Sequence, residues 1–281
     1  MTRTEDGNFT GARGQVVWRS WLPDGPVRAA IVLVHGVAEH GGRYGYVGET
    51  LATAGFAVFA PDHHGHGRSA GKNANIGSMS EVADDVAAML SIARAAYPEV
   101  PRFLLGHSMG SLIVLYLATR GPLDVAGIVL SAPPLDIPVG NALQRAAAPV
   151  LTRLAPGLGV LQLDSSTVSR DPAVIRDYDT DPLNYRGKLP VRTGAEILSA
   201  TKLVKQRLGQ LTLPALVLHG TMDTLAAPSG SDLIERSAAS ADLTVRRYDG
   251  LFHEVFNEPE RDQVLADVRG WLDAHLAPAQ Q

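Results

Sequence analysis

The pentapeptide Gly106-His107-Ser108-Met109-Gly110 lies between the apolar run Phe103 to Leu105 and the largely apolar stretch Ser111 to Thr119. A buried strand that turns tightly into a buried helix explains this pattern, because the strained central serine brings the positions two before and two after it into close contact, where only small residues fit. Such a turn lifts the Ser108 hydroxyl above the carboxyl edge of a sheet and points the first N–H groups of the helix toward it. The sequence therefore predicts a nucleophilic serine, against the alternative of an ordinary glycine-rich turn.

Short continuous apolar runs recur along the chain at residues 31–34, 56–60, 103–105, 127–130 and 215–218. Continuous apolar residues are typical of strands buried on both faces. Helical patterns lie between these runs, and Ser78 to Glu81 has the spacing of a capping box that begins a helix. We therefore predict an α/β fold with a mostly parallel central sheet flanked by helices. At its leading edge, Gln15 to Trp21 and the run from Ala29 are expected to form an antiparallel hairpin.

The alternation of strands and helices stops between about Pro134 and Lys205. Residues 137–163 carry only two charges, and their apolar residues fall on one helical stripe: Leu143, Ala147, Val150, Leu151, Leu154 and Leu158. We predict an inserted, mainly helical cap at residues 135–205, which divides the main domain into residues 1–134 and 206–281. The stripe is expected either to pack onto the main domain or to present a face that contacts lipid.

The composition excludes several classes of protein. The 281 residues include no cysteine, which excludes a disulfide framework, thiolate-bound zinc, iron–sulfur clusters and a cysteine nucleophile. The formal net charge is −4 and the charges are scattered, so no nucleic-acid partner is expected. Residues 1–14 show no secretory or transit segment, and the expected location is the cytoplasm.

A serine hydroxyl needs a base to remove its proton and a third group to orient that base. The run Ala215 to Leu218 leads into a loop that contains Asp223, the candidate acid. His253 follows the next predicted strand and is the candidate base. Asp249, on the same loop as His253, competes for the role of the acid. Asp223 is favoured because of its place at the carboxyl edge of the predicted sheet.

Two backbone donors are expected to stabilise the negative charge that develops on an attacked carbonyl oxygen. One is the N–H of Met109, directly after the serine. The other is the N–H of Val37, because the strand Ile31 to Val34 runs into the loop His35-Gly36-Val37-Ala38-Glu39-His40. The side chain of Val37 is not expected to matter for this role.

The stretch Asp62-His63-His64-Gly65-His66 superficially resembles a set of metal ligands. No second group of ligands with regular spacing follows it, and a serine triad needs no metal. The better interpretation is a tight turn whose side chains brace the loop that carries Val37. We therefore expect no metal site and no cofactor.

Several longer motifs are spread over the chain: His35-Gly36-x-x-Glu39-His40-x-x-Arg43-Tyr44, Asp62-His63-x-Gly65-His66-Gly67-Arg68-Ser69, Gly106-His107-Ser108-Met109-Gly110, Tyr178-x-x-Asp181-Pro182-Leu183, His219-Gly220-x-x-Asp223 and His253-Glu254. In combination they resemble the monoacylglycerol lipase family of α/β-hydrolases, particularly its bacterial members, over about residues 15 to 275. The resemblance implies an α/β-hydrolase fold with a triad of Ser108, Asp223 and His253. It also implies that Val37 and Met109 are the oxyanion donors.

The resemblance further implies that Glu39, Arg43 and Tyr178 lie near the glycerol end of the substrate. The chain departs from the family pattern at four positions. Ala38 and Ser111 stand where relatives often have glycine, and His64 stands where arginine is common. Val174 occupies a cap position at which the mammalian enzyme has a carboxylate, so the polar end of the pocket differs here.

The expected reaction is hydrolysis of an ester between one acyl chain and a small polar alcohol. The resemblance implies a monoacylglycerol as substrate, with a lysophospholipase or a general carboxylesterase as alternatives. The apolar stripe of the predicted cap indicates peripheral contact of the protein with a membrane or a lipid droplet. A protein of another class, a non-catalytic lipid-binding module, is expected to lack at least one triad residue, and none is missing here.

Overall fold

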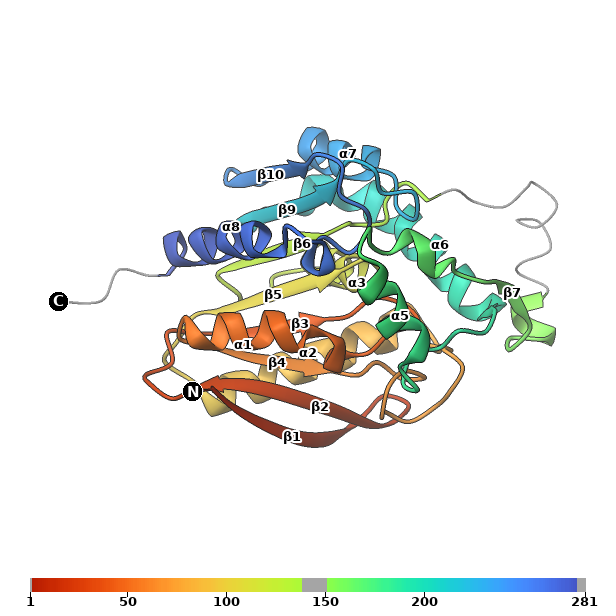
Figure 1. Cartoon of the computed structure of the whole chain (residues 1–281), viewed down its shortest axis with the longest axis horizontal. Helices are drawn as coiled ribbons and strands as arrows, with labels where there is room; N and C mark the ends of the chain where they lie inside the picture. Colours follow the sequence, from red (N-terminus) through yellow and green to blue (C-terminus); the bar gives the residue numbers. More distant parts are fainter. Residues whose placement is uncertain (1, 138–150, 277–281) are drawn as a thin grey trace.

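The computed structural model describes residues 2–137 and 151–276, in which strands and helices alternate along most of the chain (Figure 1). The strands are β1 (Thr2–Gly11), β2 (Gly14–Pro23), β3 (Ala29–Val34), β4 (Phe56–Pro61), β5 (Arg102–His107), β6 (Gly127–Ser131), β7 (Gly159–Leu161), β8 (Leu189–Pro190), β9 (Ala215–Gly220) and β10 (Leu243–Tyr248). The α-helices are α1 (Gly45–Thr53), α2 (Met79–Ala96), α3 (Met109–Ala118), α5 (Pro172–Thr180), α6 (Val191–Arg207), α7 (Ser229–Ser237) and α8 (Arg261–Ala274). Short 3-10 helices are η1 (Gly41–Tyr44), η2 (Ser165–Thr167), η3 (Leu208–Gln210) and η4 (Val255–Asn257).

Eight of these strands form one sheet in the order β1-β2-β4-β3-β5-β6-β9-β10. The six strands from β4 to β10 pair in parallel, and β1 and β2 add an antiparallel edge. Strands β3, β4, β6 and β9 are buried along their whole length, because helices cover both faces of the sheet. The predicted α/β fold with a mostly parallel sheet is confirmed.

The expected hairpin at the leading edge is wrong. Strand β2 pairs with β1 on one side and with β4 on the other, where Trp21 lies opposite Val58. Strand β3 lies between β4 and β5, so neither of its edges is free to pair with β2. The polar composition of β1 hid this strand from the sequence pattern. The tight turn is instead between Gly11 and Gly14, where Gly14 has a φ of 118° that favours glycine.

Helices cover the two faces of the sheet in separate hydrophobic layers. Helices α1 and α8 pack on one face, and α2 and α3 pack on the other (Figure 1). The predicted capping box is confirmed, because the Ser78 side chain accepts the Glu81 N–H and the Glu81 carboxylate accepts the Ser78 N–H. Because the six central strands run in parallel, their carboxyl ends lie at one edge of the sheet, between the two helical layers.

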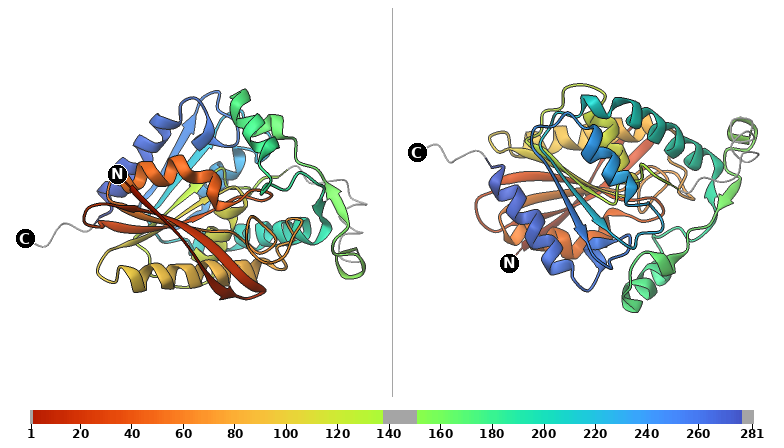
Figure 2. Two further views of the ribbon diagram at one scale, coloured as in Figure 1. Left: turned by 60° about the horizontal axis from the view of Figure 1, so that its bottom comes forward. Right: turned by 90° about the horizontal axis from the view of Figure 1, so that it is seen from above.

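The segment between β6 and β9 adds no strand to the main sheet in its described residues. It contributes α5, α6 and a separate antiparallel pair of β7 with β8. This inserted segment lies beyond the carboxyl ends of the parallel strands, as two further views show (Figure 2). Leu143, Ala147 and Val150, which belong to the expected apolar stripe, lie outside the described residues.

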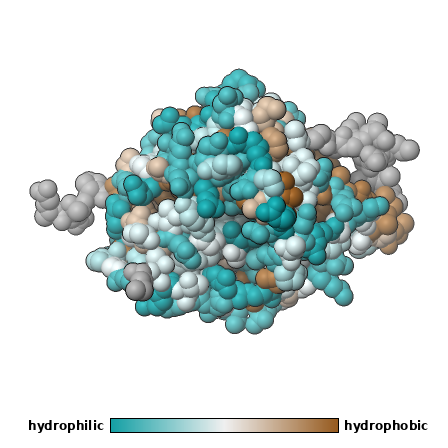
Figure 3. Space-filling model, viewed as in Figure 1, coloured by the Kyte–Doolittle hydropathy of each residue, from teal (hydrophilic) through white to brown (hydrophobic). Residues whose placement is uncertain are grey.

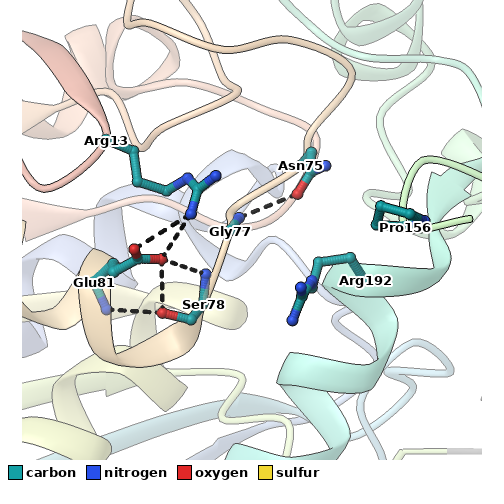
Figure 4. A pocket seen from close by; sticks show the side chains of 7 residues that line it. All are labelled: Arg13, Asn75, Gly77, Ser78, Glu81, Pro156 and Arg192. Atoms are coloured by element: carbon teal, nitrogen blue, oxygen red, sulfur yellow. Dashed lines mark hydrogen bonds and ion pairs between the residues drawn. The ribbon is translucent and has the colours of Figure 1, made fainter. Parts of the chain in front are cut away.

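The start of α6 is fixed to the loop before α2. Thr193 Oγ1 donates to Ala74 O at 2.7 Å and accepts the Ile76 N–H at 3.3 Å. Glu196 accepts the Met79 N–H at 3.0 Å. A cavity of about 330 Å³ at this seam is lined by Arg13, Asn75, Gly77, Ser78, Glu81, Pro156 and Arg192 (Figure 4). These contacts hold one end of the inserted segment against the main domain.

Candidate active site

Ser108 lies at the sharp turn between β5 and α3, with φ 53° and ψ −121°. A side chain at Gly110 would place its Cβ 1.9 Å from Val34 O, and one at Gly106 would lie 2.6 Å from the Gly110 backbone. Only glycine fits at these two positions, which is the reason for the Gly-x-Ser-x-Gly spacing. Ser108 is partly exposed, whereas His107 and Met109 on either side of it are buried. Ser108 can therefore be reached from solvent, unlike its two neighbours.

His253 is held directly beside this turn. Its Nδ1 donates to Asp223 Oδ2 at 2.7 Å, and its ring packs on the His107 ring with 4.8 Å between the centroids. Asp249 is exposed and accepts a hydrogen bond from Thr221 Oγ1 at 3.1 Å. The structure thus brings Asp223 and His253 to the turn that contains Ser108, and it gives Asp249 a different partner.

The Asp223 carboxylate is fixed by hydrogen bonds to both of its oxygens. Oδ1 accepts the N–H groups of Leu225 and Ala226 at 2.8 and 3.0 Å, and Oδ2 lies 3.1 Å from His219 Nε2. Burial raises the pKa of Asp223, but the nearby His253 and these hydrogen bonds lower that pKa by more, so the acid stays ionised. The sequence did not identify His219 as a support of Asp223, although it lies four residues earlier on the same buried strand and loop.

Two backbone N–H groups near Ser108 are unused. Among residues 2–137 and 151–276, neither Val37 N–H nor Met109 N–H has a hydrogen-bond partner. The Gly36 N–H, in contrast, donates to Glu39 Oε1 at 2.6 Å. A Cβ at Gly36 would lie 3.3 Å from Ser108 Cβ, so this loop passes directly against the serine. The N–H groups of Val37 and Met109 are therefore both available to donate to an oxygen atom near Ser108.

Glu39, Arg43 and Glu254 form a buried charge cluster behind this loop. The Arg43 guanidinium donates twice to Glu254 at 2.8 Å and once to Glu39 Oε2 at 2.6 Å. It also lies over the Tyr178 ring, 4.8 Å from the centroid. Burial raises the pKa of Glu254, but the Arg43 charge lowers that pKa by more. The structure therefore places Glu39, Arg43 and Tyr178 together, and adds Glu254 as the second partner of the arginine.

The histidines of the Asp62 to His66 turn contact the loop that carries Val37. The His63 N–H donates to His35 Nε2 at 3.0 Å, and the two rings pack at a tilt of 38° with 4.0 Å between their centroids. Asp62 Oδ1 accepts the Gly41 N–H at 2.9 Å. Burial lowers the pKa of His63 to about 3, so this imidazole is neutral at ordinary pH. In the part of the chain that the structure describes, no three His, Asp or Glu side chains are arranged to hold a metal ion.

The pH dependence of hydrolysis should follow His253. Burial lowers the pKa of this imidazole, but the charge and hydrogen bond of Asp223 raise it by more, so the pKa lies above its ordinary value of 6.5. Because the base must be neutral to accept a proton, kcat/KM for a soluble short-chain ester should fall as the pH drops through that raised pKa. A pH–rate profile measures this midpoint, and an acid limb centred well below pH 6.5 would contradict the assignment.

Comparison with known proteins identifies several similar hydrolases. A family model described as serine aminopeptidase, S33, matches residues 25–260. The chain is 42% identical to a monoacylglycerol lipase of Mycolicibacterium smegmatis over 98% of this chain and 99% of that protein. It is 35% identical to a monoglyceride lipase of Mus musculus, over 97% and 91% of the two chains. The crystal structure of a Paleococcus ferrophilus monoacylglycerol lipase superimposes with a TM-score of 0.83 at 29% identity, over 98% of this chain and 99% of that one.

Proposed function

This chain belongs to the monoacylglycerol lipase family of α/β-hydrolases, and we propose that it hydrolyses the ester bond of monoacylglycerols to glycerol and a fatty acid. The proposal rests on the position of Ser108 beside the Asp223–His253 pair, with two N–H groups next to the serine that have no partner among the described residues. A substrate with one acyl chain and a small alcohol also agrees with the names of the relatives.

The reaction follows from these groups. The Ser108 hydroxyl attacks the ester carbonyl carbon while His253 Nε2 takes the serine proton. The carbonyl oxygen becomes negatively charged and accepts hydrogen bonds from the N–H groups of Val37 and Met109. His253 then donates the proton to the leaving glycerol oxygen, and an acyl group remains on Ser108. Water attacks the acyl enzyme with His253 again as the base, which releases the fatty acid.

The glycerol end is best assigned to Tyr178. Among the described residues its hydroxyl has no hydrogen-bond partner, although the ring is largely buried. Arg43 is already paired with both Glu39 and Glu254. Glu39 and Arg43 are therefore assigned a structural role in the wall of the site. The Tyr178 hydroxyl is therefore the polar group with free capacity to contact a glycerol hydroxyl.

The substrate is tested by comparing acylglycerols that carry the same acyl chain. One acyl chain gains about 0.8 kcal/mol for each buried methylene, whereas a second and third chain would need space of their own. We expect kcat/KM for the monoacylglycerol to exceed that for the triacylglycerol by at least about tenfold, with lysophospholipids cleaved more slowly. Equal rates on all three classes would instead identify a general carboxylesterase, and faster cleavage of lysophospholipids would identify a lysophospholipase.

We also propose that the inserted segment contacts lipid surfaces. Four exposed large apolar side chains lie close together in its sequence: Leu154 (77%), Leu158 (47%), Val160 (49%) and Leu161 (57%). We call these four residues the outer apolar patch. Figure 3 shows brown, hydrophobic atoms on this side of the molecule. No helix in the described parts of the chain is long and apolar enough to span a bilayer. We propose a peripheral contact through the outer apolar patch.

Substitution of the outer apolar patch should weaken lipid binding. Leu154→Asp and Leu161→Asp each remove apolar area and add a charge that resists burial in lipid. We expect each to weaken binding to phosphatidylcholine vesicles about tenfold in a flotation assay. Gln162→Asp, on an exposed residue next to Leu161, adds the same charge without removing apolar area and is the matched control. If all three variants bind vesicles like the wild type, the patch does not contact lipid.

A further inference from the structure

The loop that carries Val37 is held by the inserted segment as well as by the main domain. The Tyr185 N–H donates to Ala38 O at 2.9 Å. His40 Nε2 lies 2.9 Å from Asp181 Oδ2. A small apolar cluster makes the third contact and consists of Val37, Ala38, Ala74, Leu163, Tyr185 and Leu189. Three different kinds of contact therefore connect residues 163–189 to this one loop.

The protonation of His40 follows from its two contacts. Its Nδ1 accepts the Gly42 N–H at 3.1 Å, so the ring proton is on Nε2 and is donated to Asp181. The other Asp181 oxygen accepts the Leu183 N–H at 2.8 Å, which fixes the carboxylate in place. A hydrogen bond to a carboxylate is stronger and more directional than one between neutral groups. The side chain of His40 is buried, which limits competition from water.

Ala38 needs such support because its backbone is strained. Its φ is 66°, in the left-handed region where residues other than glycine are uncommon. A strained residue of this kind persists only when its surroundings hold it. Ala38 directly follows Val37, so relaxation of this φ would move the Val37 peptide and its free N–H. The contact from Tyr185 is made to the strained residue itself.

We propose that Asp181, acting through His40, is a positioning residue that holds the Val37 N–H where the oxyanion forms. The N–H of Tyr185 assists by fixing Ala38. This inference rests on the proposed function, in which Val37 is an oxyanion donor. The inserted segment then has a role in the chemical step itself, separate from any role in binding lipid.

The test uses p-nitrophenyl acetate. Its ester carbonyl needs the oxyanion donors during hydrolysis, while its short acyl chain makes few contacts with the inserted segment. Asp181→Ala should lower kcat about tenfold while KM changes less than twofold, because a displaced donor weakens only the transition state. Asp181→Asn keeps an acceptor oxygen and should retain most of the activity. Asp179→Ala removes the same charge from an exposed position two residues away and should leave kcat unchanged.

Two further readouts separate positioning from general stability. The midpoint of the acid limb should be the same in Asp181→Ala and the wild type, because the His253–Asp223 pair is intact. Fluorophosphonate labelling of Ser108 should slow by the same factor as kcat, since this reaction also needs the oxyanion donors. If Asp181→Ala does not fold, His40→Asn replaces it, because asparagine keeps an acceptor for the Gly42 N–H but cannot reach Asp181.

Ala38→Gly provides the decisive control. Glycine adopts a positive φ without strain, so the loop no longer depends on support from Asp181. Alone, Ala38→Gly should change kcat less than twofold, and combined with Asp181→Ala it should restore kcat to within about threefold of the wild type. An unchanged kcat in Asp181→Ala overturns the proposal, and so does an equal loss with and without Ala38→Gly.

Assays of the wild type and of Asp181→Ala together distinguish a failure of the positioning role from a failure of the proposed function. A wild-type protein that hydrolyses monoacylglycerols and is labelled at Ser108, but is indifferent to Asp181→Ala, refutes only the positioning role. A wild-type protein that neither cleaves esters nor reacts with the fluorophosphonate refutes the function and the positioning role together.

Discussion

Ser108→Ala is expected to lower kcat on monoacylglycerols by up to about a million-fold, because the deleted hydroxyl is the attacking atom. Alanine is smaller than serine and keeps the same turn between Gly106 and Gly110, so the fold should be unchanged. Glycerol release by the purified variant measures the loss, and thermal unfolding checks the fold. Ser166→Ala, on an exposed serine outside the site, is the matched control and should behave like the wild type. A Ser108→Ala variant that keeps more than a few per cent of the activity would rule out this serine as the nucleophile.

Asp223→Asn should have the second largest effect, a loss of about 10⁴-fold in kcat. The shape of the side chain is retained, but the amide nitrogen can donate to His253 Nδ1 and then stabilises the wrong tautomer of the imidazole. Its loss of charge also removes the main reason for the raised pKa of His253.

Asp249→Asn is the matched control for this substitution. Asp249 was the competing acid in the sequence, and its hydrogen bond to Thr221 is exposed, so its substitution should change kcat less than twofold. The opposite result, with Asp249→Asn inactive and Asp223→Asn active, would exchange the roles of the two carboxylates.

The sequence predicted the parts of the fold that depend on local pattern. The buried strands β3, β4, β6 and β9 are short apolar runs, and the capping box that begins α2 is visible as Ser78 and Glu81. Strand β1 was missed because it lies at the exposed edge of the sheet, where its burial and its composition are mostly those of a loop. Because β1 was missed, we expected β2 to pair with β3, which is the wrong neighbour.

The candidate site was predictable to a different degree for each residue. Ser108 lies in a strand-to-helix pattern that is local in the sequence, and Asp223 and His253 follow from the expected order of the elements. The contacts that hold them are long-range. The hydrogen bond between His40 and Asp181 joins residues 141 positions apart, and that between Arg43 and Glu254 joins residues 211 positions apart. No local pattern identifies such pairs, because they form only when the inserted segment and the last loop pack against the region around the loop that carries Val37.

Ala38 departs from the family pattern, and its backbone conformation gives this departure a structural consequence. The resemblance to the family implied only that Ala38 stands where relatives often have glycine. The structure shows a φ of 66° at this residue and a hydrogen bond from Tyr185 to its carbonyl. The support from the inserted segment offsets a strain that glycine would not have.

Stoichiometric labelling is the sharpest test of whether Ser108 is the activated nucleophile of a monoacylglycerol hydrolase. The protein is titrated with a fluorophosphonate, the labelled peptide is identified by mass spectrometry, and monoacylglycerol hydrolysis is measured at each step. We predict one label per chain, located on Ser108, with activity falling linearly to zero as labelling approaches completion. Full labelling of Ser108 with hydrolysis intact, or loss of activity through a label on another residue, would contradict the account.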